Sequence, residues 1–271
     1  MRVERGVDAM SGNMSQDTAP LLEMRNVEKR FGDVVALRDV SFGVNAGDVV
    51  ALLGRSGSGK STLLRCLALL DATSAGEVLL EGRRTGPSET SAKALARDRA
   101  RIGVIFQNFN LFPHLSVEHN LCIGPRRVLG LTKEQARDRA LRLLESVGLR
   151  DKAHNYPVQL SGGQQQRVGI ARALAMEPAF LMFDEPTSAL DPETISDVLT
   201  VMADLAAGGT TMFVATHEIG FARQVANRVL FMHQGQIHYD GAPTSFFEHE
   251  DDPLIVGLLS RLRHEAVRKD G

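Results

Sequence analysis

The sequence predicts an α/β fold with a mostly parallel core sheet, an antiparallel β edge subdomain and a helical subdomain. The first reason is that apolar, strand-like runs alternate with helical patterns from Leu21 onward. The second is a glycine-rich loop directly after the apolar run 49–53, and the third is an apolar run at 180–183 that ends in two acidic residues. Short, continuous apolar strands are typical of parallel sheets, which are covered on both faces.

The individual elements follow from these patterns in chain order. Residues 22–27 and 34–44 predict the antiparallel edge, and the predicted parallel core comprises residues 49–53, 102–106, 180–183 and 211–216. Between the second and third core strands the pattern is helical. Its clearest helix is 132–147, where Thr132 and Gln135 form a capping box. A late hairpin is predicted at 229–239, with its turn at Gly235.

The glycine-rich loop matches the pattern G-x-x-x-x-G-K followed by serine or threonine, between a strand and a helix. Glycines let successive backbone N–H groups point at an anion, and the N-terminus of the following helix adds partial positive charge. We expect Lys60 to reach the β- and γ-phosphates of a nucleotide and Ser61 to ligate Mg²⁺. The alternative is an ordinary glycine-rich turn. The predicted phosphate-binding residues are Gly54, Arg55, Ser56, Gly57, Ser58, Gly59, Lys60, Ser61 and Thr62.

A second tract reads Leu-Ser-Gly-Gly-Gln at residues 160–164 and precedes an apolar helix. Ser161 and Gln164 form a capping box, so one interpretation is an ordinary helix start. Two adjacent glycines, Gly162 and Gly163, instead leave backbone N–H groups open to a ligand. Here the chain resembles the ATP-binding cassette (ABC) ATPases, whose signature is LSGGQ, over about residues 21–250. The resemblance implies a P-loop NTPase of the ABC type that works as a head-to-tail homodimer, with Ser161, Gly162, Gly163 and Gln164 binding the ATP held by the other copy.

The acidic pair Asp184 and Glu185 ends a buried strand, and two buried carboxylates are costly unless they bind a cation or border a polar site. Asp184 is therefore predicted to bind Mg²⁺. The resemblance implies that Glu185 is the general base that activates the attacking water. The alternative interpretation is a surface turn with two solvated acids.

Further sites are implied by the resemblance and are weak by themselves. Gln107, after the strand 102–106, matches the loop that contacts Mg²⁺ and senses the γ-phosphate. His217, after the strand 211–216, matches the histidine that hydrogen-bonds the γ-phosphate. Asp191 matches a loop at the dimer interface, although Asp191 followed by proline is also a good helix N-cap. Phe31 matches the aromatic residue that stacks on adenine, although a single aromatic near a strand is also typical of a core.

Composition limits the domain organisation and the partners. The chain has 271 residues, a net charge of −2 and two cysteines, so nothing favours nucleic acid or a disulfide framework. No apolar run of about 18 residues is present. We expect a disordered leader at 1–20, one cassette at 21–250 with its helical subdomain at about 107–163, and a short C-terminal helix and tail at 251–271.

The tract 106–116, Phe-Gln-Asn-Phe-Asn-Leu-Phe-Pro-His-Leu-Ser, most resembles ABC ATPases that energise bacterial uptake of polar amino acids, opines or ectoine. The resemblance implies permease subunits in the membrane, an extracytoplasmic solute-binding protein and a peripheral place on the cytoplasmic face of the inner membrane. The alternative is an ABC ATPase for envelope remodelling or lipoprotein release. The tract contains an apolar cluster, which comprises Phe109, Leu111, Phe112 and Leu115. This cluster either binds the permease or forms a local core. The less acidic tract at 233–240 departs from the pattern and leaves the transported solute open.

Overall fold

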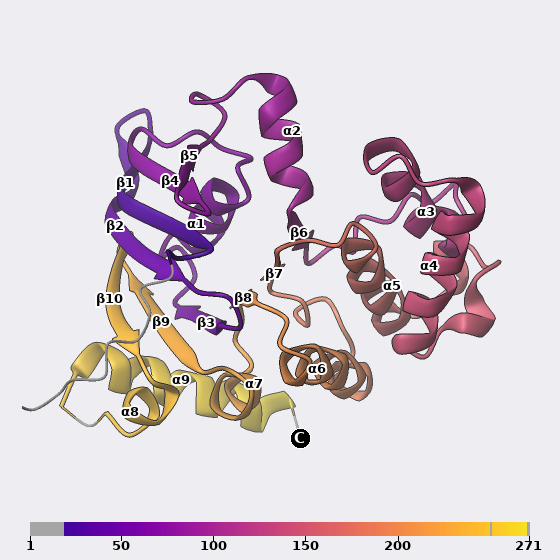
Figure 1. Cartoon of the computed structure of the whole chain (residues 1–271). Coiled ribbons are helices and arrows are strands. Elements are labelled where there is room, and N and C mark those ends of the chain that lie inside the picture. The colour runs from indigo at the N-terminus through magenta and orange to yellow at the C-terminus, as the bar shows by residue number, and fades with distance from the viewer. Residues whose placement is uncertain (1–18, 250, 270–271) are drawn as a thin grey trace, which may run out of the picture.

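The computed structural model describes residues 19–249 and 251–269, so almost all of the predicted leader at 1–20 lies outside the described residues (Figure 1). Within them, the core sheet has the strand order β10-β9-β3-β8-β7-β6. All of its neighbouring strands are parallel except β9 and β10, which form the predicted hairpin. Its strands are β3 (Val49–Gly54), β6 (Ile102–Ile105), β7 (Phe180–Asp184), β8 (Met212–Ala215), β9 (Arg228–His233) and β10 (Gln236–Gly241).

The antiparallel edge is larger than the sequence predicts. Beside β1 (Leu22–Phe31) and β2 (Val34–Val44) lie β4 (Ala75–Leu80) and β5 (Arg83–Thr85), in the order β2-β1-β4-β5. The last two strands come from the chain after the first helix, and β4 pairs with β1 across about fifty intervening residues, for example Leu22 with Leu80. This pairing is long-range, which is why local patterns did not reveal it.

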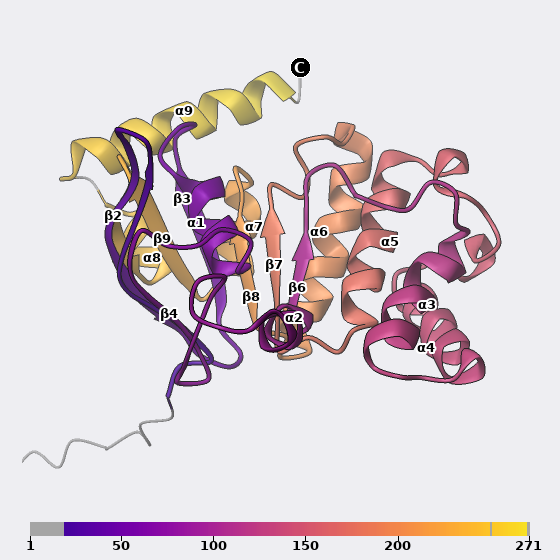
Figure 2. The same cartoon turned by 90° about the horizontal axis from the view of Figure 1, so that it is seen from above.

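Two apolar layers enclose the core sheet. One face packs, together with the antiparallel sheet, around α1 (Lys60–Leu67), and the other face packs against α6, α7, α8 and α9 (Figure 2). The buried thiol of Cys66 lies in the first layer. The bounds of these later helices are α6 (Pro192–Ala207), α7 (Ile219–Gln224), α8 (Pro243–Phe247) and α9 (Pro253–Lys269). Helix α9 therefore runs further toward the C-terminus than the short helix that the sequence predicts.

A separate small core unites the helical group. It joins α3 (Val117–Val128), α4 (Lys133–Ser146) and α5 (Gly162–Leu174), with short 3₁₀ turns at Arg150–Lys152 and Pro157–Gln159. The predicted capping box of Thr132 and Gln135 is confirmed at the start of α4. Helix α5 carries the Leu-Ser-Gly-Gly-Gln tract and contributes its apolar face to this core, so the helical group continues beyond residue 163.

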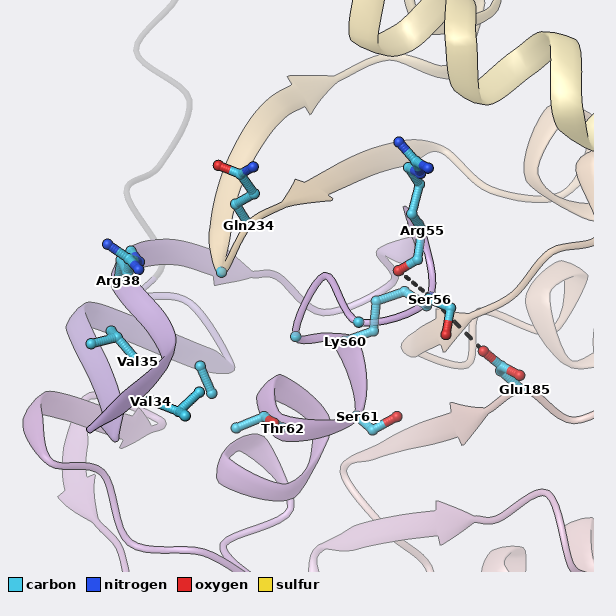
Figure 3. A pocket seen from close by; sticks show the side chains of 14 residues that line it. Val34, Val35, Arg38, Arg55, Ser56, Lys60, Ser61, Thr62, Glu185 and Gln234 are labelled. Atoms are coloured by element: carbon cyan, nitrogen blue, oxygen red, sulfur yellow. Dashed lines mark hydrogen bonds and ion pairs between the residues drawn. The ribbon is translucent and has the colours of Figure 1, made fainter. Parts of the chain in front are cut away.

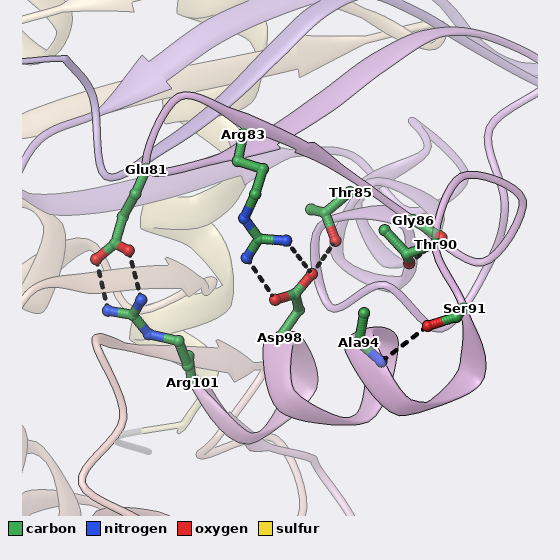
Figure 4. A network of polar contacts seen from close by, with 9 residues as sticks. All are labelled: Glu81, Arg83, Thr85, Gly86, Thr90, Ser91, Ala94, Asp98 and Arg101. Atoms are coloured by element: carbon green, nitrogen blue, oxygen red, sulfur yellow. Dashed lines mark hydrogen bonds and ion pairs between the residues drawn. The ribbon is translucent and has the colours of Figure 1, made fainter.

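Helix α2 (Ala92–Ala100) stands between the antiparallel sheet and the helical group (Figures 1 and 2). Its Asp98, almost fully buried, accepts hydrogen bonds from the Arg83 guanidinium, at 2.7 and 3.3 Å, and from the Thr85 hydroxyl at 2.5 Å (Figure 4). Arg101, just after the helix, forms a bidentate pair with Glu81. These contacts fix α2 and the residue after it to β5 and to the turn between β4 and β5. No helix among the described residues is long and apolar enough to cross a membrane.

Candidate functional site

The glycine-rich loop runs from the end of β3 to the start of α1, as predicted, and its backbone is curled. Gly57 and Gly59 have φ of +77° and +107°, a region that side chains disfavour. A Cβ atom on Gly59 would also lie only 2.8 Å from the carbonyl oxygen of Ala36. The loop therefore needs glycine at this position both for its conformation and for its fit against β2.

Lys60 begins α1 with its ammonium group turned back into the loop. Its Nζ donates hydrogen bonds to the carbonyl oxygens of Gly54 at 2.8 Å and Arg55 at 3.4 Å. The side chain is 6% exposed, and burial lowers the pKa of Lys60 although Glu185 and Asp184 partly oppose the shift. A buried cation held mainly by carbonyl groups is well placed to receive an anion.

The two acidic residues at the end of β7 have different environments. Burial raises the pKa of Asp184, and the charge of Glu185 adds to the rise. A hydrogen bond with His217 lowers the pKa of Glu185, and Oε1 of Glu185 lies 3.1 Å from Nε2 of His217 and 3.9 Å from Nζ of Lys60. Because an ionised carboxylate can only accept, His217 donates from Nε2. Glu185 also has a φ of +48°, which is uncommon for a residue with a side chain.

A pocket of about 620 Å³ gathers part of the predicted site (Figure 3). Figure 3 shows Glu185 facing the loop on the side where Lys60 and Ser61 lie. The predicted residues that line the pocket are Arg55, Ser56, Gly57, Gly59, Lys60, Ser61, Thr62 and Glu185. Of the others, Gly54 and Ser58 belong to the same loop, and His217 and Asp184 adjoin Glu185 without lining the pocket.

The pocket also has walls that the sequence analysis missed. One wall is β2, with Val34, Val35, Ala36 and Arg38, and another is the β9–β10 turn, with Gln234 and Gly235. The turn is bonded to both neighbours, because the Gly235 N–H donates to the carbonyl of Ser58 at 2.9 Å and its carbonyl accepts from the N–H of Arg38 at 2.8 Å. No local motif marks these residues, and only the tertiary contacts reveal them.

Phe31 and Gln107 do not line the pocket. Phe31 ends β1 with half of its side chain exposed, and the Nζ of Lys29 lies 4.9 Å from its ring centroid. Gln107 follows β6 and is exposed. Their roles toward adenine and the γ-phosphate therefore stay predictions.

The signature tract lies apart from this pocket, at the start of α5. Ser161 is the N-cap: its side-chain oxygen accepts from the N–H of Gln164 at 3.3 Å, and Gln164 returns a bond to the N–H of Ser161 at 3.1 Å. Neither these two residues nor Gly162 and Gly163 line the pocket of their own chain. The chain thus places the two predicted parts of the nucleotide site apart from each other.

The donor atoms fit a nucleotide with a divalent cation. The loop supplies backbone N–H groups and Lys60, and the buried hydroxyl oxygen of Ser58 has no hydrogen-bond partner. Ser61 and Asp184 offer hydroxyl and carboxylate oxygens, the ligands that Mg²⁺ prefers. The described residues hold no cluster of three or more His, Cys, Asp or Glu side chains that could bind a metal.

The protein family described as ABC transporter matches residues 37–188, a span that includes the phosphate loop, the signature tract and the acidic pair. The chain belongs to this family. The predictions of an ABC-type cassette fold and of an ATPase coupled to transport are thereby confirmed.

Curated relatives of this ABC ATPase are transport proteins. The glutamate transport ATP-binding protein GluA of Corynebacterium efficiens is 52% identical over 89% of this chain and 99% of its own length. The nopaline permease ATP-binding protein P of Agrobacterium fabrum is 46% identical over 90% of this chain and 98% of its own length. These relatives do not favour the alternative of envelope remodelling.

Solved ABC cassettes have the same fold. CbiO1 from Clostridium perfringens, described as part of an ABC transporter complex, is 28% identical with a TM-score of 0.77, over 93% of this chain and 99% of its own. The cassette MJ0796, solved as a dimer in a post-hydrolysis state bound to ADP and Pi, is 35% identical with a TM-score of 0.73, over 82% of this chain and 98% of its own.

Proposed function

We propose that this ABC ATPase energises the import of a polar amino acid or a related solute such as an opine or ectoine. The observation that carries the proposal is the division of the site: the phosphate pocket and the signature tract are both present, yet they lie on separate parts of one chain. The kind of solute is inferred from the relatives, which are named for glutamate, glutamine and nopaline transport.

Two copies bound head to tail would complete two ATP sites. In each site Lys60, Ser61, Gln107 and Asp184 of one copy would face Ser161, Gly162 and Gly163 of the other. The dimeric MJ0796 cassette supports this arrangement. The dimer closes when ATP fills both sites, since each nucleotide then contacts both copies.

Hydrolysis follows from the polar groups around Glu185. Mg²⁺ held by Ser61 and Asp184 would neutralise charge on the phosphates. Glu185 is a carboxylate at neutral pH, and the hydrogen bond with His217 that lowers its pKa further stabilises this ionised form. It would accept a proton from the attacking water. Lys60 donates to the phosphate oxygens as charge develops there, and His217 would do so once its Nε2–H turns from Glu185 to the γ-phosphate. The site needs mainly this positioning and charge neutralisation.

The surface that would receive the permease is an apolar groove of about 860 Å³ between α2, β6, α3 and α5. Exposed apolar side chains at its edge include Phe112, Ile123 and Val128. The charged residues that line it are all basic: Lys93, Arg97, Arg99, Arg127 and Arg172. This lining suits an apolar permease segment that carries acidic side chains, and it would hold the protein at the membrane surface. An extracytoplasmic solute-binding protein would deliver the solute to the permease.

Uptake in the native organism tests the proposal. Labelled polar amino acids, opines and ectoine are supplied to cells with the wild-type gene or with Glu185→Gln at the chromosomal locus. Glu134→Gln, an exposed substitution on α4, is the matched control. We expect loss of uptake of one class of compound in the Glu185 variant only. Unchanged uptake of every compound, with normal protein levels, would contradict the proposed import function.

A further inference from the structure

The segment that follows Gln107 has an unusual backbone. Two adjacent residues, Phe109 and Asn110, have φ of +55° and +51°. This left-handed conformation is uncommon for residues other than glycine and is least expected for a bulky aromatic one. Such a conformation persists only where the surroundings hold it. Gln107 lies two residues before Phe109, so Asn108 is the only residue between it and this segment.

Arg172, near the end of α5, supplies that hold. Its Nη1 donates to the carbonyl oxygen of Asn110 at 2.6 Å, and its Nη2 approaches the carbonyl of Phe109 at 3.4 Å. The guanidinium carbon also lies 5.8 Å from the ring centroid of Phe112. One rigid, forked side chain thus contacts three residues of the loop.

The other side of the loop contacts the signature end of the same helix. A Cβ atom placed on Gly162 would lie 3.6 Å from Cζ of Phe109, so the phenyl ring lies against the first turn of α5. Phe109 and Arg172 together fasten the loop to α5 at both ends of the helix. Gln107, by contrast, continues directly from β6 of the core sheet. Asn108 therefore connects Gln107, which follows the core sheet, to Phe109, which contacts α5.

The charge of Arg172 is incompletely compensated. Burial lowers the pKa of its guanidinium, and it forms no ion pair with a carboxylate among the described residues. Arg172 also lines the groove, whose charged residues are all basic. Its acceptors are carbonyl oxygens, which leave further N–H donors of the guanidinium available. A carboxylate that entered the groove would find a half-buried, oriented partner.

We propose that Arg172 is a positioning residue that sets Gln107 for the γ-phosphate, and that an acidic permease segment in the groove strengthens this hold by pairing with Arg172. The proposal rests on the proposed function, because it takes Gln107 as the γ-phosphate sensor and the groove as the permease site. Binding of a permease segment in the groove would thus act on the γ-phosphate site through the guanidinium of Arg172.

A double-mutant cycle on the transporter complex tests the proposal. The full chain is assembled with its permease in proteoliposomes, and ATP hydrolysis is measured with and without transported solute for wild type, Gln107→Ala, Arg172→Ala and the double variant. We expect Arg172→Ala to lower kcat about 10-fold, to reduce the stimulation by solute toward 1, and to leave ADP affinity unchanged, since ADP lacks the phosphate that Gln107 contacts. In the Gln107→Ala background, Arg172→Ala should lower kcat by less than about 2-fold further.

Two additional variants keep the test decisive. Arg172→Lys retains the positive charge but not the forked guanidinium, and it replaces Arg172→Ala if the alanine variant does not fold. We expect a smaller loss of kcat, which is again not additive with that of Gln107→Ala. Arg126→Ala removes an exposed arginine of α3 that makes no hydrogen bond or ion pair among the described residues, and it should behave like wild type.

Two outcomes would overturn the proposal. Multiplicative losses in the double variant, with Gln107→Ala itself impaired, would show that Arg172 acts independently of Gln107 and would leave the proposed function intact. An unimpaired Gln107→Ala variant would refute the proposal and also remove Gln107 from the proposed catalytic site.

Discussion

The phosphate pocket and the signature tract bind the same nucleotide in the proposed dimer, yet the chain builds them in opposite ways. The pocket is enclosed by distant segments: β2, the β9–β10 turn and the glycine loop are joined through backbone hydrogen bonds of Gly235. The signature tract is a helix start whose capping box satisfies the N–H groups of Ser161 and Gln164 within the same turn. It stands on a helical group with a small core of its own.

This difference indicates which half can work alone. The pocket supplies a buried cation, Lys60, and curled backbone before any partner arrives. The signature tract offers the exposed Ser161 and the N-terminus of α5, and a second copy has to bring them to the nucleotide. A single chain should therefore bind nucleotide, whereas hydrolysis should require the dimer.

The largest expected effect is at the pocket. Lys60→Ala removes the buried ammonium group and should weaken ATP binding about 100-fold, a loss of about 2.7 kcal/mol, because the phosphates lose their main cation. Isothermal titration with the purified chain measures it. Lys133→Ala, an exposed lysine at the start of α4, is the control. Nearly unchanged ATP affinity in the Lys60 variant would mean that the loop backbone alone binds the phosphates.

At the signature tract, Ser161→Trp should stop hydrolysis and spare binding. We expect turnover to fall about 100-fold while ATP affinity of the single chain stays within about 2-fold, because the bulky ring blocks only the second half-site. Thr132→Trp removes the equivalent capping box on α4 and controls for a lost helix cap, worth about 1 kcal/mol. A loss of ATP affinity specific to the Ser161 variant would contradict the division into half-sites.

Between the two regions, Asp98 should matter for stability rather than for nucleotide binding. Asp98→Asn should cost about 2 kcal/mol of unfolding free energy, because the hydrogen bonds from Arg83 and Thr85 to an ionised acceptor are weakened. Urea unfolding measures the change, and Asp138→Asn on the exposed face of α4 is the control. Equal stability of the two variants would show that this network does not anchor α2.

The pH dependence of the Asp98 effect has a definite sign. Burial tends to raise the pKa of Asp98, but hydrogen bonds from Arg83 and Thr85 outweigh it, and the pKa lies below its usual value of 3.8. The carboxylate therefore stabilises the fold above about pH 4, and this contribution is lost as the pH falls through the lowered pKa. The difference in stability between wild type and Asp98→Asn should shrink correspondingly below pH 4. A constant difference down to the acid transition would contradict this assignment.

The smallest expected effect is a difference in reaction rate between the two cysteine thiols, one in each region. Cys66 lies in α1 behind the phosphate loop and Cys122 in α3 of the helical group, and burial raises the pKa of each to about 11. Both should react slowly with a maleimide at pH 8, Cys122 the faster because it is 6% exposed against 1% for Cys66. ATP should slow only Cys66. The variants Cys66→Ser and Cys122→Ser separate the two rates, and protection of Cys122 alone would reverse the comparison.

Local patterns predicted the parts of the site that are formed by consecutive residues. The phosphate loop lies between β3 and α1, Ser161 and Gln164 form the capping box, and Asp184 ends β7 as expected. Local patterns did not predict β4 and β5, helix α2, or the contributions of Arg38 and Gln234 to the pocket. The pocket contributions and the pairing of β4 with β1 depend on residues far apart in the chain, whereas the β4–β5 hairpin and α2 are local elements that are short or mostly polar.

The sequence by itself therefore determined the chemical groups and their local conformations: the predicted phosphate loop, the acidic pair at a strand end and the helix that Ser161 caps. Spacing, glycine and capping chemistry act over a few residues, so they can be recognised without the fold. Only the tertiary structure decided which distant segments close the pocket, that the two half-sites of one chain stay apart, and that Arg172 reaches the carbonyl of Asn110. Those contacts arise when apolar layers pack together, and many different sequences can satisfy that packing.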